Sequence, residues 1–231
     1  MNPNDTSWIG VFDPTAEVRV VERRLPHWSQ SGTLCFITWR TWDSIPSGVL
    51  AGRVAERDSW LRRHGIDPDA EDREARLGRL TPDLRHEFRE LVSARWEEAL
   101  DRCHGSCVLR RPDCAKVVAD SLLHFDGDRY LMTDFVVMPN HVHLLVAFPD
   151  GDRMRDQCES WKRYTAVRLN RLLARSGRCW ETDSFDHLVR SQGQFEYLRR
   201  YVADNPSRAG LRAGEFVHYS RPPAVSAPGV R

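Results

Sequence analysis

Long hydrophobic runs are missing from this sequence of 231 residues. Its apolar stretches are far shorter than the ~20 residues that an α-helix needs to cross a bilayer, which excludes a helical membrane protein. The first residues, MNPNDTSWIG, contain neither a basic start nor an apolar segment of the kind found in secretion signals. We therefore expect a cytoplasmic protein with no membrane partner, in which the six cysteines are free thiols.

Net charge is also nearly absent, at +1, but the two signs are unevenly distributed. Residues 1–152 hold 19 Lys and Arg against 25 Asp and Glu, whereas residues 153–231 hold 15 against 8. The C-terminal third is therefore basic. This favours a polyanionic partner such as nucleic acid, although a solvated helix surface can have the same composition.

Alternating hydrophobicity predicts several strands. TLCFITWRTW (33–42) alternates aromatic and β-branched residues, and FDHLVR (185–190) is a short candidate. YLMTDFVVM (130–138) and HVHLLVAF (141–148) are joined through Pro139 and Asn140, which is the tightest hairpin signal in the chain. The sheet therefore contains at least one antiparallel pair.

Capping residues and helical spacing predict helices between and after these strands. Thr81 and Pro82 begin a long amphipathic helix, and Pro112 begins a second one that ends near the turn at 126–129. A third helix runs from about 153 to 176, and a fourth, at 194–205, is stopped by Pro206. The alternation predicts an α+β fold with helices packed on one face of a small sheet.

The length fits most simply one domain with an insertion, or two small domains. Residues 1–30 are polar and contain three prolines, which predicts an irregular lead-in. The main domain spans 31–215 and carries a helical insertion at about 52–110, where both charge signs are crowded together. Residues 216–231 are rich in Pro and Ala and predict a disordered tail.

Two histidines stand one residue apart in MPNHVHLL (138–145). On a strand, His141 and His143 share a face with Leu145 and Ala147, and the opposite face is wholly apolar and must cover the core. Two neutral imidazoles this close can bind one metal ion. Because a solvent-facing pair without a role is the alternative, the hypothesis needs a third ligand.

The helix expected at 194–205 supplies that candidate. Tyr197, Tyr201 and Asn205 are four residues apart and fall on one stripe. The amide oxygen of Asn205 can complete a site of two nitrogens and one oxygen. A C-terminal cap before Pro206 is the alternative role for Asn205, and half-buried packing is the alternative for the tyrosines.

The two motifs together resemble a known family. FVVMPNHVHLLV, followed about fifty residues later by YLRRYVADNPSRAGL, is similar to the HUH single-strand transposases with one catalytic tyrosine, above all the REP-associated tyrosine transposases. RRLPHW, TLCFITWR, SWKRYTAVRLN and FDHLVR are similar to other blocks of that family. The resemblance covers the chain apart from roughly residues 52–110.

This resemblance implies a ferredoxin-like (RRM-like) antiparallel sheet and an HUH-type endonuclease that cleaves and transfers single-stranded DNA next to short hairpins. Tyr201 stands at the position of the nucleophile, which forms a 5′-phosphotyrosine link and leaves a free 3′-OH. His141, His143 and Asn205 would hold a divalent metal. The metal implied is Mg²⁺ or Mn²⁺, and the amide oxygen favours the first whereas the imidazoles favour the second.

DNA binding is expected in the basic C-terminal region, with single-stranded or hairpin DNA as the partner of a monomer or a homodimer. Lys162, Arg163, Arg168 and Arg171 are spaced to place several charges on one side of a helix, and Trp180 is a candidate for stacking on an unpaired base. A solvated helix face is the alternative for the cations, and core packing is the alternative for the tryptophan.

Two other functions stay open at this point. One is a hairpin-binding protein of the same fold that does not transpose, and the other is an RNA-binding regulator. Retention of Tyr201 together with both histidines favours the enzyme, because a binding protein has no use for a nucleophile beside a metal pair.

A second cysteine-based site is less favoured. CHGSC (103–107) together with Cys114 looks like a zinc cluster. Its spacing matches neither a paired C-x-x-C knuckle nor a Cys-Cys-His-His finger. We expect Cys103, Cys107 and Cys114 to be small buried thiols.

Overall fold

The computed structural model describes residues 8–21, 27–182 and 184–222. The chain divides into two compact units, one made of Met1–Trp42 with Cys107–Arg231 and the other of Asp43–Ser106. No helix within the described ranges is long and apolar enough to cross a membrane. None of the six cysteines, all of which lie within the described ranges, forms a disulfide, as the sequence predicts.

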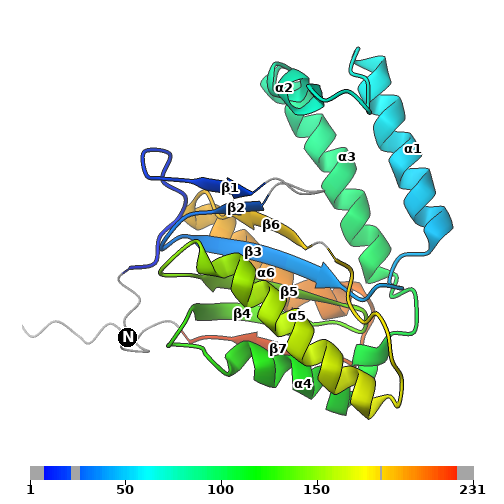
Figure 1. Cartoon of the computed structure of the whole chain (residues 1–231), viewed down its shortest axis with the longest axis vertical. Coiled ribbons are helices and arrows are strands. Elements are labelled where there is room, and N and C mark those ends of the chain that lie inside the picture. The colour runs from blue at the N-terminus through cyan, green and yellow to red at the C-terminus, as the bar shows by residue number, and fades with distance from the viewer. Residues whose placement is uncertain (1–7, 22–26, 183, 223–231) are drawn as a thin grey trace, which may run out of the picture. The chain divides into compact units, whose positions relative to one another are not determined.

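An antiparallel sheet of five strands is the centre of the first unit (Figure 1). Along the chain its strands are β3 (Leu34–Arg40), β4 (Leu131–Val137), β5 (His141–Ala147), β6 (Phe185–Leu188) and β7 (Val217–Ser220). Across the sheet their order is β6-β3-β5-β4-β7. A short 3-10 helix, η1 (Val108–Arg110), precedes α4 (Pro112–Leu123), and α5 (Arg153–Leu172) follows β5. The series β3-α4-β4-β5-α5-β6 is the ferredoxin-like arrangement, and the predicted α+β class is confirmed.

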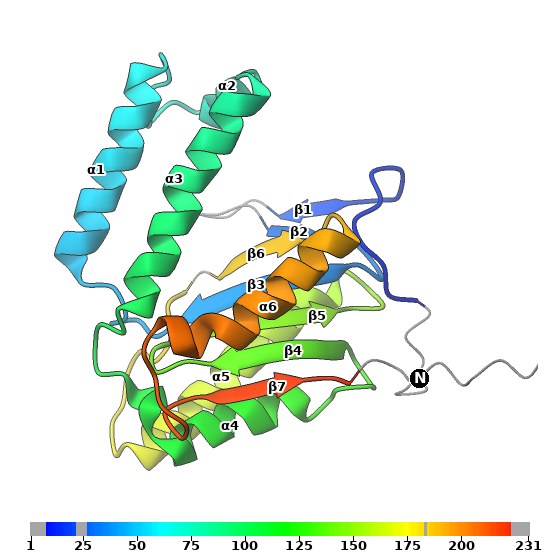
Figure 2. The ribbon, with the colours of Figure 1, turned by 180° about the vertical axis from the view of Figure 1, so that it is seen from behind.

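Helices cover both faces of this sheet, whereas the sequence predicts helices on one face. Val142 and Leu144 of β5 face α4 and α5 and lie in one core, as predicted. Leu145 and Ala147 face the other way, into a second core with α6 (Gln192–Arg208), which Figure 2 shows in front of the sheet. The one-face prediction is wrong because these two residues make the histidine side of β5 apolar too, so that it also needs a cover.

Helix α6 continues through Pro206, where the sequence predicts its end. Proline has no N–H to donate and interrupts one backbone hydrogen bond, but its fixed φ is helical. The helix extends only to Arg208, and Gly210 then takes a positive φ of 66°. Asn205 therefore lies inside α6, and the alternative role of a C-terminal cap does not apply to it.

Both ends of the chain contain regular structure where the sequence predicts none. In the lead-in, β1 (Arg19–Val21) pairs antiparallel with β2 (His27–Ser29). In the tail, β7 pairs with β4, and its four residues are too short and too polar to be recognised as a strand from composition. Residues 223–231, the rest of the predicted disordered tail, lie outside the described residues.

The second unit is the helical insertion, with bounds of 43–106 against predicted bounds of about 52–110. Its helices are α1 (Ser47–Arg63), α2 (Arg73–Gly78) and α3 (Pro82–Asp101). The two ends of the unit meet, because the backbone N–H of Ser106 donates to a carboxylate oxygen of Asp43 at 2.8 Å. Gly105 takes a φ of +88° there, and a Cβ at this position would lie 2.4 Å from the Asp43 carbonyl oxygen.

Candidate active site

Two histidines of β5 and two residues of α6 meet on one face of the sheet. His141 and His143 are the first and third residues of β5, and Tyr201 and Asn205 lie one helical turn apart on α6. In the order His141, His143, Tyr201 and Asn205, the residues are 0%, 1%, 5% and 0% exposed. We call these four residues the histidine–tyrosine cluster.

His143 links Tyr201 to the sheet. Its Nδ1 is 2.7 Å from Oγ1 of Thr38, its cross-strand neighbour on β3, and its Nε2 is 3.4 Å from the hydroxyl oxygen of Tyr201. When Nδ1 donates its proton to Thr38, Nε2 keeps a lone pair and accepts the phenolic proton. That lone pair can hold the proton of Tyr201 or a metal ion, but not both at once.

His141 is oriented by the residue before it. Its Nδ1 lies 2.8 Å from Oδ1 of Asn140, and because that oxygen can only accept, Nδ1 donates and Nε2 carries a lone pair. The rings of His141 and His143 are 4.6 Å apart. Nε2 of His141 and both polar atoms of the Asn205 amide are buried and have no hydrogen-bond partner among the described residues.

Both imidazoles are neutral near pH 7. Burial lowers the pKa of His141 to about 3, against a smaller opposing effect of the Asn205 amide. Burial also holds the pKa of His143 well below its usual value, and the neighbouring His141 and Arg208 lower it further. A neutral imidazole is the form that binds metal ions and accepts protons.

The cluster fits a divalent metal ion in its donor chemistry. The two imidazole rings lie 4.6 Å apart, and the Asn205 side chain is near enough to His141 to raise its pKa. Nε2 of His141 and Oδ1 of Asn205 are buried without a well-formed hydrogen bond, which costs free energy unless something binds them. Asn140 and Thr38 hold the other ring nitrogens, as outer partners of metal-binding histidines do. No group of three or more His, Cys, Asp or Glu side chains suited to a metal occurs among the residues described.

Arg208 is a residue of this region that sequence reasoning did not assign to the site. Its guanidinium carbon lies 5.1 Å from the centre of the Tyr201 ring, and its side chain is exposed whereas the cluster is buried. The signal that could have found it is its place in NPSRAG (205–210), one turn beyond Asn205. Arginine at this position can bind a phosphate that approaches Tyr201.

No family model and no curated protein matches the sequence. Among solved structures, the chain is similar to one described as "Structure of the REP associates tyrosine transposase bound to a REP hairpin", with a TM-score of 0.42 and 12% sequence identity. The matched region covers 83% of this chain and 76% of that chain. A likeness this distant leaves the function to be argued from the chain's own residues.

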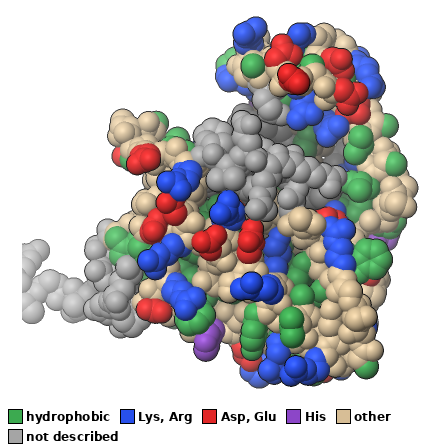
Figure 3. All heavy atoms as spheres, viewed as in Figure 1, with side chains coloured by type: hydrophobic (Ala, Val, Ile, Leu, Met, Phe, Trp, Pro, Cys, Tyr) green, Lys and Arg blue, Asp and Glu red, His purple; other side chains and the backbone are tan. Residues whose placement is uncertain are grey.

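The predicted DNA-binding cations lie on the other face of the sheet. Helix α5 packs into the core opposite α6, so Arg163, Arg168 and Arg171 point to solvent away from the cluster. Figure 3 shows the side formed by α4 and α5, where Lys and Arg side chains lie among exposed apolar ones. The structure therefore does not bring the predicted cations together with Tyr201.

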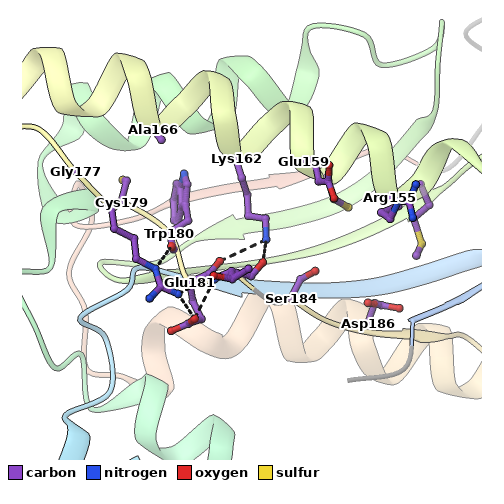
Figure 4. Close-up of a pocket in the computed structure, with 14 residues that line it drawn as sticks. Arg155, Glu159, Lys162, Ala166, Gly177, Cys179, Trp180, Glu181, Ser184 and Asp186 are labelled. Atoms are coloured by element: carbon purple, nitrogen blue, oxygen red, sulfur yellow. Dashed lines mark hydrogen bonds and ion pairs between the residues drawn. The ribbon is translucent and has the colours of Figure 1, made fainter. Parts of the chain in front are cut away.

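Lys162 is used within the protein. Its Nζ donates to the main-chain carbonyl of Thr182 at 2.7 Å and to that of Glu181 at 3.4 Å, which ties α5 to the segment before β6 (Figure 4). These two elements enclose a pocket of about 380 Å³. The pocket lies on the α5 side of the sheet and is separate from the histidine–tyrosine cluster.

Trp180 is not available for stacking on a base in this structure. It is 6% exposed, its Nε1 donates to Oγ1 of Thr165 at 2.9 Å, and its ring packs edge-on against Trp39. The stacking prediction is wrong because residue type alone does not distinguish an exposed tryptophan from a core one, and core packing, the alternative, is what occurs.

The three cysteines of the rejected zinc site differ in burial. Cys114 is buried in α4, whereas Cys103 and Cys107 are half-buried. Both of the latter take a left-handed φ, at 49° and 48°. The expected burial therefore holds for Cys114 and not for the other two.

Exposed arginines of α5 provide a test of the predicted DNA-binding face. If they contact phosphates, Arg163→Gln and Arg168→Gln should each reduce the log–log slope of affinity against salt by about 0.7 on single-stranded DNA. Arg76→Gln, an exposed arginine of α2, is the matched control and should leave the slope unchanged. Fluorescence anisotropy over a salt series measures both, and equal slopes in all variants would remove this face from DNA binding.

Proposed function

We propose that the protein cleaves single-stranded DNA beside hairpins and transfers the cut strand, with Tyr201 as the nucleophile. The observation that supports this most is the position of the Tyr201 hydroxyl, 3.4 Å from Nε2 of His143 and in the same buried cluster as His141 and Asn205. Each buried polar group costs free energy, and a hydrophobic core gains nothing from gathering four of them at one point.

The chemistry is a transesterification. The oxygen of Tyr201 forms a bond to the phosphorus, and the bond from phosphorus to the 3′ oxygen breaks. The phenol loses one proton and the departing 3′ oxygen gains one, which leaves a free 3′-hydroxyl. The 3′-hydroxyl of an acceptor strand reverses these steps and releases Tyr201. Because one phosphodiester replaces another, the cycle needs no nucleotide cofactor.

The residues of the chain divide this work. His143 accepts the phenolic hydrogen bond in the resting state and Thr38 fixes its orientation. Arg208 is placed to bind the incoming phosphate at the ring of Tyr201. His141, His143 and Asn205 would hold Mg²⁺ or Mn²⁺, which when bound neutralises charge on the phosphate.

The burial of the histidine–tyrosine cluster favours a second candidate function, which is binding of hairpins without cleavage. With His141, His143, Tyr201 and Asn205 almost fully buried, a phosphate reaches Tyr201 only after α6 or neighbouring side chains move. A protein that binds hairpins without cutting them has no need for this movement. Cleavage itself, and not binding alone, must therefore be measured.

Covalent adduct formation tests the proposal. The purified protein is incubated with Mg²⁺ or Mn²⁺ and a labelled pool of DNA hairpins with single-stranded flanks, including sequences that border its own gene. We expect a protein–DNA band on a denaturing gel and a labelled free 3′-OH fragment. Hairpin binding without any adduct would support the non-cleaving alternative, and preference for the matched RNA hairpins would support a regulator of RNA.

A further inference from the structure

The outer strand β6 carries an aromatic side chain in register with the histidine–tyrosine cluster. Thr38 of β3 is the cross-strand partner of both Phe185 on β6 and His143 on β5, so these three side chains share one face of the sheet. Two strand spacings separate Phe185 from His143, which is about 10 Å between their Cα atoms. That distance corresponds to about three base steps of 3.4 Å along a DNA strand.

A row of rings connects Phe185 to Tyr201. The Phe185 ring is 5.7 Å from His187, and His187 is 5.3 Å from Phe36. Phe36 in turn lies 5.4 Å from His143 and 5.9 Å from Tyr201. The row therefore runs without a break from the edge of the sheet to the proposed nucleophile.

The outer end of this row is partly exposed, although β2 also contacts β6. Helix α6 packs over β4 and β5, and Phe185 at the β6 edge is 37% exposed while Phe36 is buried. His187 lies half-buried between them, and burial lowers its pKa to about 4, with Arg190 lowering it further, so that its ring is neutral near pH 7. An exposed phenylalanine on a neutral ring offers a flat apolar surface beside the cluster.

We propose that Phe185, supported by His187, is the stacking platform for an unpaired base within about three nucleotides of the phosphate that Tyr201 attacks. The proposal rests on the proposed function and adds to it the group that positions the strand. Stacking on an aromatic face tolerates any base, since every base has a π-face. A base held on Phe185 also holds the nearby phosphate in position for Tyr201. Phe185 is thus a positioning residue, and the bond changes stay with Tyr201.

The test combines a variant with an abasic substrate. Phe185→Ala should lower kcat/KM for adduct formation about tenfold on an intact strand. Removing single bases within three nucleotides of the cleavage site should lower kcat/KM of the wild type by a similar factor at one position. At that position Phe185→Ala should cause no further loss, because the base it stacks on is already missing. Phe185→Leu, which keeps apolar bulk without a π-face, should resemble Phe185→Ala.

Tyr164→Ala is the matched control, since Tyr164 is an exposed ring on α5, on the other face of the sheet. It should keep the full sensitivity to the missing base. Additive losses for Phe185→Ala and the abasic site, or wild-type activity of Phe185→Ala, would overturn the platform. If the wild type forms no adduct, the proposed function fails. The Kd of the wild type and of Phe185→Ala is then measured on the same intact and abasic strands. Equal Kd values for wild type and Phe185→Ala on the intact strand would then overturn the platform separately.

Discussion

A Tyr201→Phe variant is expected to form no covalent adduct and to lose cleavage by at least about 10³-fold, since it lacks the only atom that can join the phosphate. The substitution removes one hydroxyl and keeps the ring that packs edge-on against His143 and Phe36. The lost hydrogen bond to His143 is long, at 3.4 Å, but its removal leaves the buried Nε2 of His143 without this donor and should cost about 1–3 kcal/mol of stability. Affinity for hairpin DNA should stay close to that of the wild type.

Tyr197→Phe is the matched control for this variant. Tyr197 lies one turn earlier on the same helix and is 58% exposed, outside the buried cluster. It should keep most of the activity. The measurement is an adduct band on a denaturing gel with labelled hairpin DNA, followed by mass spectrometry of the linked peptide. A link mapped to Tyr197, or an adduct that survives in Tyr201→Phe, would show that the nucleophile is wrongly assigned.

The second large effect is expected from removing the metal or its ligands. His141→Ala, His143→Ala and an excess of chelator should each abolish cleavage, because the phosphate then meets Tyr201 without charge neutralisation. Hairpin binding should persist, since other residues hold the DNA. Mn²⁺ binding, followed by electron paramagnetic resonance, should be lost in both variants whether or not the protein is active.

Two controls separate this effect from misfolding. His124→Ala changes an exposed histidine at the end of α4 and should bind Mn²⁺ and cleave as the wild type does. Thermal unfolding checks that the cluster variants fold, since each leaves a buried partner, Asn140 or Thr38, without its hydrogen bond. Cleavage that continues undiminished in chelator would exclude the metal from the mechanism.

Local pattern is enough to predict most of the elements of the fold. The alternation in HVHLLVAF correctly assigns Val142, Leu144 and Val146 to a core, and the proline at 112 correctly begins α4. What pattern does not contain is which elements cover which face. The cations of α5 and the tyrosines of α6 both show helical spacing, which does not tell on which side of the sheet each helix packs. The two helices lie on opposite sides.

For the candidate site, too, the sequence predicts the local arrangement of the residues but not how the elements meet. The spacing of Tyr201 and Asn205 and the register of the two histidines follow from helix and strand geometry. Their meeting across α6 and β5 does not follow from this geometry. The donor chemistry of Asn205 makes it a candidate third ligand, and the family resemblance is what joins it and Tyr201 to the two histidines. Thr38 gave no signal at all, because it comes next to His143 through strand pairing between residues that are distant in the sequence.

The closed ends of the insertion change how fast that pairing can form. Thr38 and His143 are 105 residues apart, and the contact between Asp43 and Ser106 spans 63 of them. If the helices of the insertion form first from their local contacts, the effective loop shortens from 105 to about 42 residues, which lowers the entropy cost of closing it by about 0.8 kcal/mol. Opening the contact between Asp43 and Ser106 would restore the loop of 105 residues, and it would then slow the folding of the sheet even if the native contacts of the sheet were unchanged.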